Sequence, residues 1–231
     1  MNADAIATNL AAVHARIAAA CARAGRDAAS VDLLAVSKLQ PTAAVRAAWA
    51  AGQRRFGENR VQELVAKAGE LADLDALRWH LIGSLQTNKV RELLGVAGLA
   101  LVHSVDRERL ADELQRGLLP VGRTLDVLLQ VHGTDEATKH GCRPAAVPAL
   151  LEHVQRRCPA LRVEGVMAMG PLQGEAMPVF AAVAALRDRL RVHSGLPLPV
   201  LSLGMSGDLE AAVAAGSTLV RIGGAVFGRH R

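Results

Sequence analysis

The sequence predicts a single (β/α)8 TIM barrel spanning residues 1–231, with an extra helix at its N-terminus. Short apolar runs alternate with helical patterns eight times, and no linker interrupts them. Runs that are apolar on both faces are typical of parallel strands covered by helices. No Gly-x-Gly-x-x-Gly turn follows the first strand, which counts against a dinucleotide-binding sheet. An open doubly wound sheet is the alternative, because the number of strands does not settle closure.

The predicted elements follow in order from the periodicity. Ile6, Leu10, Val13 and Ile17 recur at helical spacing, and Gly25 ends this first helix. The first strand, 33–37, is a buried apolar run that stops before Pro41. The other strands are expected at 55–57, 79–83, 99–103, 126–131, 161–167, 200–203 and 218–221. The helices between them are expected at 42–51, 61–71, 87–94, 107–117, 144–157, 175–193 and 209–215, and a short turn follows 223–224.

Composition limits the class of protein. A hydrophobic content of 51% and a mean hydropathy of +0.21 exclude a disordered chain, while no uncharged apolar run approaches the ~18 residues of a membrane span. The first residues carry an acid and lack the basic start of a signal peptide, so we expect a cytoplasmic protein without a membrane partner. We also expect a monomer.

Nucleic acid and metal are not expected ligands. The net charge is +5, but the basic residues are dispersed, and aromatic residues make up 2% of the chain with no tyrosine, so no base-stacking surface is available. The three cysteines, Cys21, Cys142 and Cys158, have no metal-ligand spacing, and the eight histidines never occur as His-x-x-x-His.

Lys38 follows the first strand and is the first candidate functional residue. In alternating strand-helix folds, ligands bind where the strands end, and an amine held against apolar neighbours becomes a better nucleophile toward carbonyls. A lysine that forms a Schiff base is therefore one interpretation. A solvated lysine without a special role is the other, and this stretch alone favours the latter.

The C-terminal stretch favours the Schiff-base interpretation of Lys38. Ser206-Gly207 follows the seventh strand and Gly223-Gly224 the eighth, and barrels commonly bind a phosphate at these two loops through main-chain N–H groups. An ordinary helix cap and ordinary tight turns would explain each loop separately. Arg221 ends the eighth strand, which a closed barrel places beside the first, and there its guanidinium faces the barrel mouth.

Together these groups indicate pyridoxal 5'-phosphate (PLP). A lysine suits its aldehyde, the glycine loops suit its phosphate, and an arginine, which can only donate hydrogen bonds, suits an unprotonated pyridine nitrogen. Such a ring binds well but stabilises carbanions poorly.

Several motifs carry a family resemblance over residues 6–228. They are Leu34-Ala-Val-Ser-Lys38, Phe56-Gly-Glu-Asn-Arg-Val-Gln-Glu63, Trp79-His-Leu-Ile-Gly83, Leu85-Gln-Thr-Asn-Lys89, His103-Ser-Val-Asp106 and Leu203-Gly-Met-Ser-Gly-Asp-Leu-Glu210. The chain resembles the YggS/PROSC family of pyridoxal phosphate homeostasis proteins. The resemblance implies a barrel of the alanine racemase N-terminal type, in which Lys38 holds the cofactor as an internal aldimine. It also implies Asn59 near the ring hydroxyl, Arg221 at the ring nitrogen, Met205 against the ring, and Ser206, Gly207, Gly223 and Gly224 at the phosphate.

The expected function is to hold PLP and to buffer it or pass it to PLP-dependent apoenzymes, without catalytic turnover. The alternative is an amino-acid racemase or a related enzyme. Two-base racemisation needs an acid/base group on each face of the substrate, and Lys38 supplies only one. In the racemases that the chain resembles, a tyrosine and a second domain complete the site, and this sequence has neither. His80 or His103 could substitute for that tyrosine in principle, but both lie in apolar strand runs, where a histidine is more often structural.

Two further expectations concern the surroundings of the site. Glu58 is interpreted as a polar loop group and Glu63 as a charge on a helix face. The polar segment from Thr134 to Cys142 is interpreted as a mobile lip of the pocket.

Overall fold

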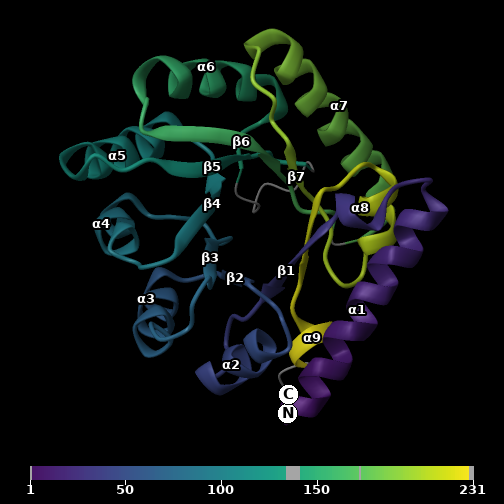
Figure 1. The fold of residues 1–231 in the computed structure, drawn as a ribbon. Coiled ribbons are helices and arrows are strands. Elements are labelled where there is room, and N and C mark those ends of the chain that lie inside the picture. Colours follow the sequence, from purple (N-terminus) through teal and green to yellow (C-terminus); the bar gives the residue numbers. More distant parts are fainter. Residues whose placement is uncertain (1, 134–140, 172, 229–231) are drawn as a thin grey trace.

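The computed structural model describes residues 2–133, 141–171 and 173–228 and contains a closed barrel of parallel strands (Figure 1). The strands are hydrogen-bonded in sequence order, and β8 closes on β1. Their bounds are β1 Asp32–Val36, β2 Arg55–Glu58, β3 Arg78–Leu81, β4 Leu99–Val105, β5 Leu125–Gln130, β6 Leu161–Met167, β7 Val200–Ser202 and β8 Leu219–Ile222. The barrel predicted from the alternation is confirmed, and the open sheet is excluded.

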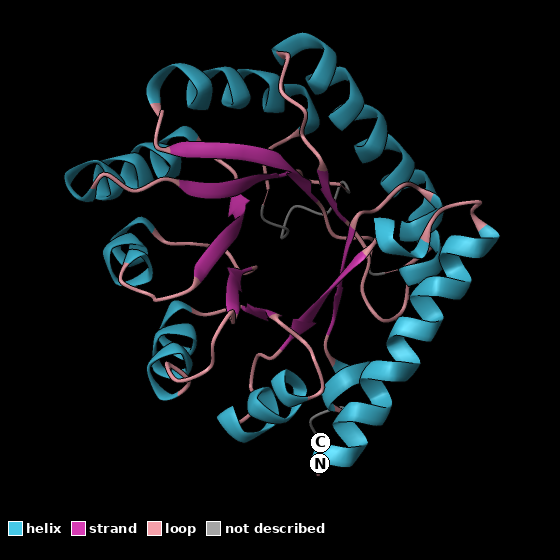
Figure 2. Ribbon diagram, viewed as in Figure 1, coloured by secondary structure: helices cyan, strands magenta, loops and turns pink. Residues whose placement is uncertain are grey.

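Helices surround the strands on the outside of the barrel (Figure 2). They are α1 Ala3–Arg23, α2 Thr42–Ala50, α3 Val61–Glu70, α4 Val90–Leu94, α5 Glu108–Leu118, α6 Val147–Arg157, α7 Ala176–Ser194, α8 Leu209–Ala214 and α9 Gly224–Phe227. The predicted helices 87–94 and 144–157 each begin with a 3-10 turn, at Thr87–Lys89 and Pro144–Ala146. Pro148 explains the second case, since a proline has no N–H to donate and fits only the first turn of an α-helix.

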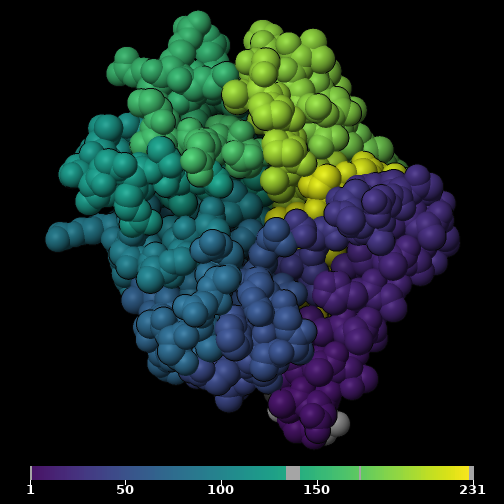
Figure 3. All heavy atoms as spheres, viewed as in Figure 1, coloured from purple at the N-terminus to yellow at the C-terminus, as the bar shows by residue number. Residues whose placement is uncertain are grey.

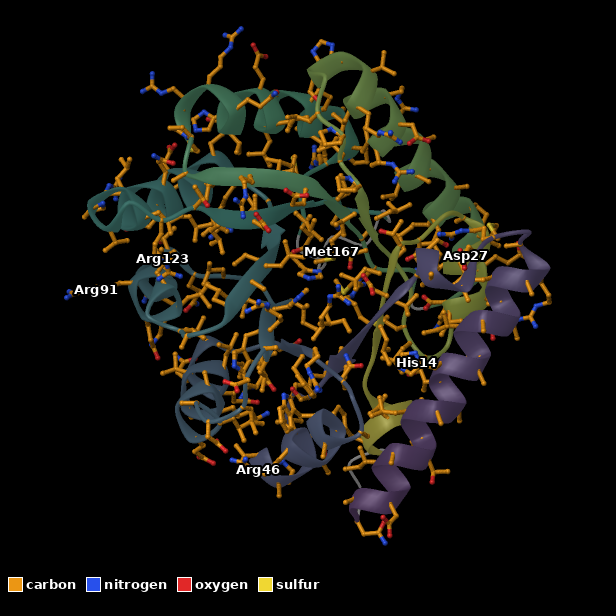
Figure 4. All side chains as sticks on the ribbon, in the orientation of Figure 1. His14, Asp27, Arg46, Arg91, Arg123 and Met167 are labelled. Carbon is orange, nitrogen blue, oxygen red and sulfur yellow. The ribbon has the colours of Figure 1, made fainter. Side chains whose placement is uncertain are left out.

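Alternate strand residues face two separate apolar layers. Most buried side chains fill the space between strands and helices, whereas Leu34, Leu101, Leu128, Met167 and Leu219 form a second cluster. Figure 4 places Met167 near the centre of the barrel, so this smaller cluster fills the barrel interior. The interior is therefore closed by apolar packing below the ends of the strands.

The extra N-terminal helix braces the C-terminal part of the barrel. In α1, Ile6, Leu10, Val13 and Ile17 are buried, and the helix packs against α2, α8 and α9, so purple and yellow segments adjoin in Figure 3. Among the described residues, α1 is also the one helix whose length and hydropathy would suit a membrane span, a criterion that core helices of soluble proteins meet too.

The pairing of β1 with β8 positions the candidate site. Leu34 pairs with Arg221, and Ala35 pairs with Ile222. The chain that leaves β1 at Ser37 therefore emerges beside the chain that leaves β8 at Gly223. Residues far apart in the sequence meet at this end of the barrel, as strand closure requires.

Candidate functional site

A cavity of about 490 Å³ opens at the carboxyl ends of the strands. Its volume lies within the range typical of small-molecule sites. All eight residues that the sequence predicted for the site line it: Lys38, Asn59, Met205, Ser206, Gly207, Arg221, Gly223 and Gly224. The other lining residues are Val36, Ile82, Gly83, Ser84, Gln130, Met167 and Met169. Closure of the barrel thus brings together every predicted position, while the role of each stays a prediction.

Lys38 lies two residues beyond the end of β1, at the mouth of the cavity. Its side chain is exposed, so the expectation that apolar neighbours surround its amine is wrong for this structure. The backbone before it is fixed, because Ser37 is fully buried and its N–H donates to the Gly57 carbonyl over 2.9 Å. The main chain before Lys38 is therefore held rigidly, while the exposed Lys38 residue lines the open cavity.

A buried ion pair lies directly beneath Lys38. The Lys67 ammonium on α3 donates to the Glu58 carboxylate and to the Ser37 carbonyl, each over 2.7 Å, and the Ser37 hydroxyl donates to Glu58 over 2.6 Å. Burial raises the pKa of Glu58, and the hydrogen bonds from Lys67 and Ser37 oppose that shift. The interpretation of Glu58 as a polar loop group is wrong, because it ends β2 and is fully buried. Nothing in the local sequence identifies this pair, since its two charges come from a strand and from the next helix.

The residue after Lys38 is also constrained. Leu39 has a φ of 63°, in the left-handed region that a branched side chain rarely adopts, and its N–H donates to Glu63 over 3.2 Å. Glu63 is thus more than a helix-face charge, because its carboxylate holds the turn that follows Lys38. Both neighbours of Lys38 are positioned by acidic residues of the Phe56–Glu63 motif.

Arg221 is buried in the wall of the cavity. Nη1 donates to the Ser202 carbonyl over 2.7 Å and to its hydroxyl over 2.8 Å, and Nη2 donates to the Ala168 carbonyl over 2.9 Å. A guanidinium has five N–H bonds, so the Nε–H and one Nη2–H have no acceptor within the described part of the chain. Burial lowers the pKa of Arg221 to about 10, which leaves it cationic at neutral pH. These two donors suit a ligand atom that accepts hydrogen bonds.

Behind Arg221, a hydrogen-bonded row of buried side chains crosses the barrel interior. The Ser202 hydroxyl lies 3.2 Å from Nδ1 of His103, whose Nε2 lies 3.0 Å from Nδ1 of His80. Burial lowers the pKa of both rings, to about 3 for His80. Both histidines are therefore neutral at physiological pH and support the Arg221 wall, in line with the structural role expected of them.

The two glycine loops present free main-chain donors to the cavity. Within the described residues, the N–H groups of Ser206, Gly207, Gly223 and Gly224 have no acceptor. The helix after β7 begins at Leu209, as predicted, so Ser206-Gly207 lies in the loop that precedes it.

Two side chains hold the first of these loops in place. Arg16 of α1 donates to the Ser206 carbonyl over 2.8 Å and pairs with Glu210 over 2.6 Å, and Asp208 accepts from the Met205 N–H. The fixed loop, the second glycine loop, the Arg221 donors and the Lys38 amine together fit a phosphorylated aldehyde with an acceptor atom in its ring.

The remaining predicted residues border the same cavity. Asn59 follows β2 and is half-buried, and Met205 is 41% exposed at the cavity rim. A Cβ on Gly83 would lie 2.0 Å from the Asn59 carbonyl oxygen, so only glycine allows this close approach. The predicted mobile lip largely lies outside the described residues, because 134–140 are not among them.

Comparisons with known proteins identify the family of the chain. The family model described as alanine racemase, N-terminal domain, matches residues 3–231. A pyridoxal phosphate homeostasis protein of Pseudomonas aeruginosa is 50% identical over 227 residues, which cover 96% of this chain and 95% of that protein. The structure of PipY from Synechococcus elongatus with PLP bound is 38% identical, has a TM-score of 0.83, and covers 96% of this chain and 100% of that one.

The similarity to a complete racemase is limited to the fold. Alanine racemase from Corynebacterium glutamicum is 18% identical with a TM-score of 0.67, and the match covers 98% of this chain but 61% of that one. The relatives of high identity, by contrast, match along nearly their whole length. The chain belongs to the alanine racemase N-terminal domain family and, within it, to the pyridoxal phosphate homeostasis proteins.

Proposed function

We propose that this protein binds PLP in the barrel-mouth cavity, with Lys38 as the residue that links to it covalently, and takes part in the cell's handling of that cofactor. One observation carries the proposal. A single cavity contains an exposed amine, a buried cation with two unpaired N–H groups, and two loops with free main-chain N–H groups. The solved PLP complex of the related PipY supports it.

Each group has a distinct proposed task. When bound, the cofactor supplies an aldehyde that an amine attacks reversibly. Lys38 would supply that amine, and the main-chain N–H groups of Ser206, Gly207, Gly223 and Gly224 would hold the phosphate. Asn59 would hold the ring hydroxyl, and Met205 would pack against the ring. Arg221 donates to the ring nitrogen and, because it stays charged, does not transfer a proton to it. This choice of donor favours retention of the cofactor over carbanion chemistry.

We propose that the protein buffers or delivers PLP without sustained turnover of an amino acid. Among the described residues that line the cavity, Lys38 and Arg221 are the titratable ones. Racemisation by two bases would need a second acid/base group opposite Lys38, and Arg221 cannot serve because it holds its proton. The cavity therefore supports a carrier better than an enzyme.

An absorbance titration with PLP tests the binding site. The protein should develop the visible band of a lysine-bound cofactor, and Lys38→Ala should not develop it. Lys89→Ala is the matched control, because Lys89 does not line the cavity and pairs with Glu92 on the outside. A wild-type protein without the band, or a Lys38→Ala variant with an unchanged band, would refute the assignment.

A second experiment separates the carrier from the enzyme. The loaded protein is incubated with amino acids in D2O, and exchange of the α-proton is followed by NMR. We expect no catalytic exchange and, in a parallel assay, activation of a PLP-dependent apoenzyme by the loaded protein. Multiple turnovers of any amino acid would contradict the carrier function.

We further propose that the protein acts as a monomer, since the described residues of one chain form the whole cavity. Light scattering after gel filtration of the loaded and unloaded protein measures this directly. A stable dimer in both states would contradict it.

A further inference from the structure

A second cluster of reactive side chains lies outside the barrel, where α5 packs against α6. Asp112 projects from α5, His153 from α6, and Cys158 directly follows α6. One potential ligand atom of each residue lies within 4.8 Å of the others. None of the three residues lines the cofactor cavity.

We propose that Asp112, His153 and Cys158 form a binding site for a divalent transition metal ion, with zinc as the ion that fits best. One oxygen, one nitrogen and one sulfur ligand make up a donor set that zinc accepts and that magnesium or calcium does not. Three protein ligands leave the fourth tetrahedral position to water. The site would connect two neighbouring helices of the outer ring.

Two of the three separations between the ligand atoms are close to those of a tetrahedral site. Nε2 of His153 lies 2.8 Å from Oδ1 of Asp112, and Sγ of Cys158 lies 3.7 Å from the same oxygen. With zinc–nitrogen and zinc–oxygen bonds of about 2.0 Å and a zinc–sulfur bond of about 2.3 Å, the corresponding separations would be about 3.3 and 3.5 Å. The side chains of Asp112 and His153 therefore need to separate by only about half an ångström.

The surroundings of His153 favour an ion at this place. Its Nδ1 lies 3.5 Å from the Glu108 carboxylate, while its Nε2 lies against Asp112. A neutral imidazole has a single N–H and can donate to only one of these two acceptors. A metal ion between Nε2 and Asp112 would leave the Nδ1–H for Glu108, which is the common arrangement around a metal-bound histidine.

The competing explanation is a protonated His153 that donates to both carboxylates without any metal. In that arrangement the Cys158 thiol only donates a hydrogen bond to Asp112 over 3.7 Å, whereas the metal site uses all three side chains as ligands. In the metal-free protein the thiol is protonated, because burial and Asp112 raise the pKa of Cys158 to about 11. Coordination would break the S–H bond, form a metal–sulfur bond, and release the proton to solvent.

An entry path exists from the surface. The side chain of Asp112 is 45% exposed and that of His153 is 20% exposed, while Cys158 is fully buried behind them. An ion would thus meet the carboxylate first and the thiol last. The sequence predicted no metal site because His153 on α6 and Cys158 just after it are five residues apart, and the third ligand comes from α5.

Titration with Co²⁺ tests the site most directly. The reduced, chelator-treated full-length protein, free of PLP, is titrated while the near-ultraviolet sulfur-to-cobalt band and the visible bands of tetrahedral cobalt are recorded. We expect one equivalent of cobalt to bind with a sulfur-to-cobalt band, and zinc to displace it.

Matched variants locate the ligands. Cys158→Ser should abolish the sulfur-to-cobalt band, and His153→Gln and Asp112→Asn should each weaken zinc binding by at least the roughly 10- to 100-fold that loss of an outer-shell partner costs. Cys21→Ser and Cys142→Ser are the controls, because both residues are buried thiols outside the cluster. Circular dichroism verifies that every variant is folded.

The outcomes are decisive and independent of the cofactor assignment. Cobalt that binds without a sulfur band, or with a band that survives Cys158→Ser, would overturn the site. Failure to bind either ion at micromolar concentration would also overturn it and would favour the protonated His153 bridge. None of these results bears on PLP binding, which is measured at Lys38.

Discussion

Removal of the Lys67 ammonium should reveal how the chain before Lys38 is held. Lys67→Met keeps most of the side-chain volume but deletes the donor to the Ser37 carbonyl and to the Glu58 carboxylate. The Glu58 carboxylate would then remain fully buried, with the Ser37 hydroxyl as its remaining donor among the described residues. An uncompensated buried charge of this kind is strongly destabilising.

The expected loss of stability follows from the burial of the Glu58 carboxylate. Loss of one partner of a buried pair costs about 3 to 5 kcal/mol, and Glu58→Gln should cost less, because the amide oxygen of the substituted side chain would still accept from Lys67 and Ser37. The double variant Lys67→Met/Glu58→Gln should be more stable than Lys67→Met, since it removes the stranded charge. For a chain of this length, Lys67→Met should lower Tm by roughly 10 °C.

Urea denaturation of the four proteins measures this double-mutant cycle. Lys89→Met is the control, because its partner Glu92 is partly exposed and such a pair is worth less than about 1 kcal/mol. A Lys67→Met variant that loses no more stability than the control, or a double variant less stable than Lys67→Met, would refute this role of the pair. In addition, Lys67→Met should slow the covalent reaction of PLP with Lys38, which stopped-flow absorbance detects.

The remaining predictions address other parts of the site. Arg221→Lys should weaken PLP binding roughly tenfold to hundredfold in a fluorescence titration, because lysine cannot bridge Ser202 and Ala168; unchanged affinity would contradict the proposed donor role. Gly83→Ala should destabilise the protein by about 1 to 3 kcal/mol through its clash with Asn59, whereas Gly69→Ala, with open space around it, should cost nothing in the same melting assay. Burial lowers the pKa of His80 from 6.5 to about 3. The contribution of its neutral form to the free energy of unfolding is therefore complete above pH 6.5, and acidification to about pH 5 lowers that free energy by about 2 kcal/mol. His80→Gln should flatten that part of the stability–pH curve, and an unchanged slope would show that His80 is not buried in its neutral form.

The sequence predicted the barrel well because its signals are local. Buried parallel strands appear as apolar runs, and amphipathic helices appear as apolar residues at helical spacing, as in Ile6 to Ile17 of α1. Closure then follows as a topological consequence and places Arg221 beside Lys38. Six of the predicted site residues could be brought together in this way because each follows a strand or ends one, namely Lys38, Ser206, Gly207, Arg221, Gly223 and Gly224. Asn59 and Met205, by contrast, were expected from the family resemblance alone.

Contacts between side chains of different elements could not be predicted in the same way. Glu58 was interpreted as a loop residue, since no pattern reveals that Lys67, on the following helix, turns toward it. The exposure of Lys38 and the row from Arg221 to His80 likewise depend on packing in three dimensions. The cluster at Cys158 was not predicted for the same reason, because its ligands come from different elements, α5 and the C-terminal part of α6 with the residue that follows it.

Peptide mapping after borohydride reduction tests the central claim most directly. The protein is loaded with PLP, reduced so that any link to an amine becomes permanent, digested, and analysed by mass spectrometry. The sequence contains four lysines, Lys38, Lys67, Lys89 and Lys139, so the position of the adduct is informative. We expect one adduct per chain, on Lys38. An adduct on another lysine, or a mixture without preference for Lys38, would contradict the assignment of Lys38 as the residue that links to the cofactor.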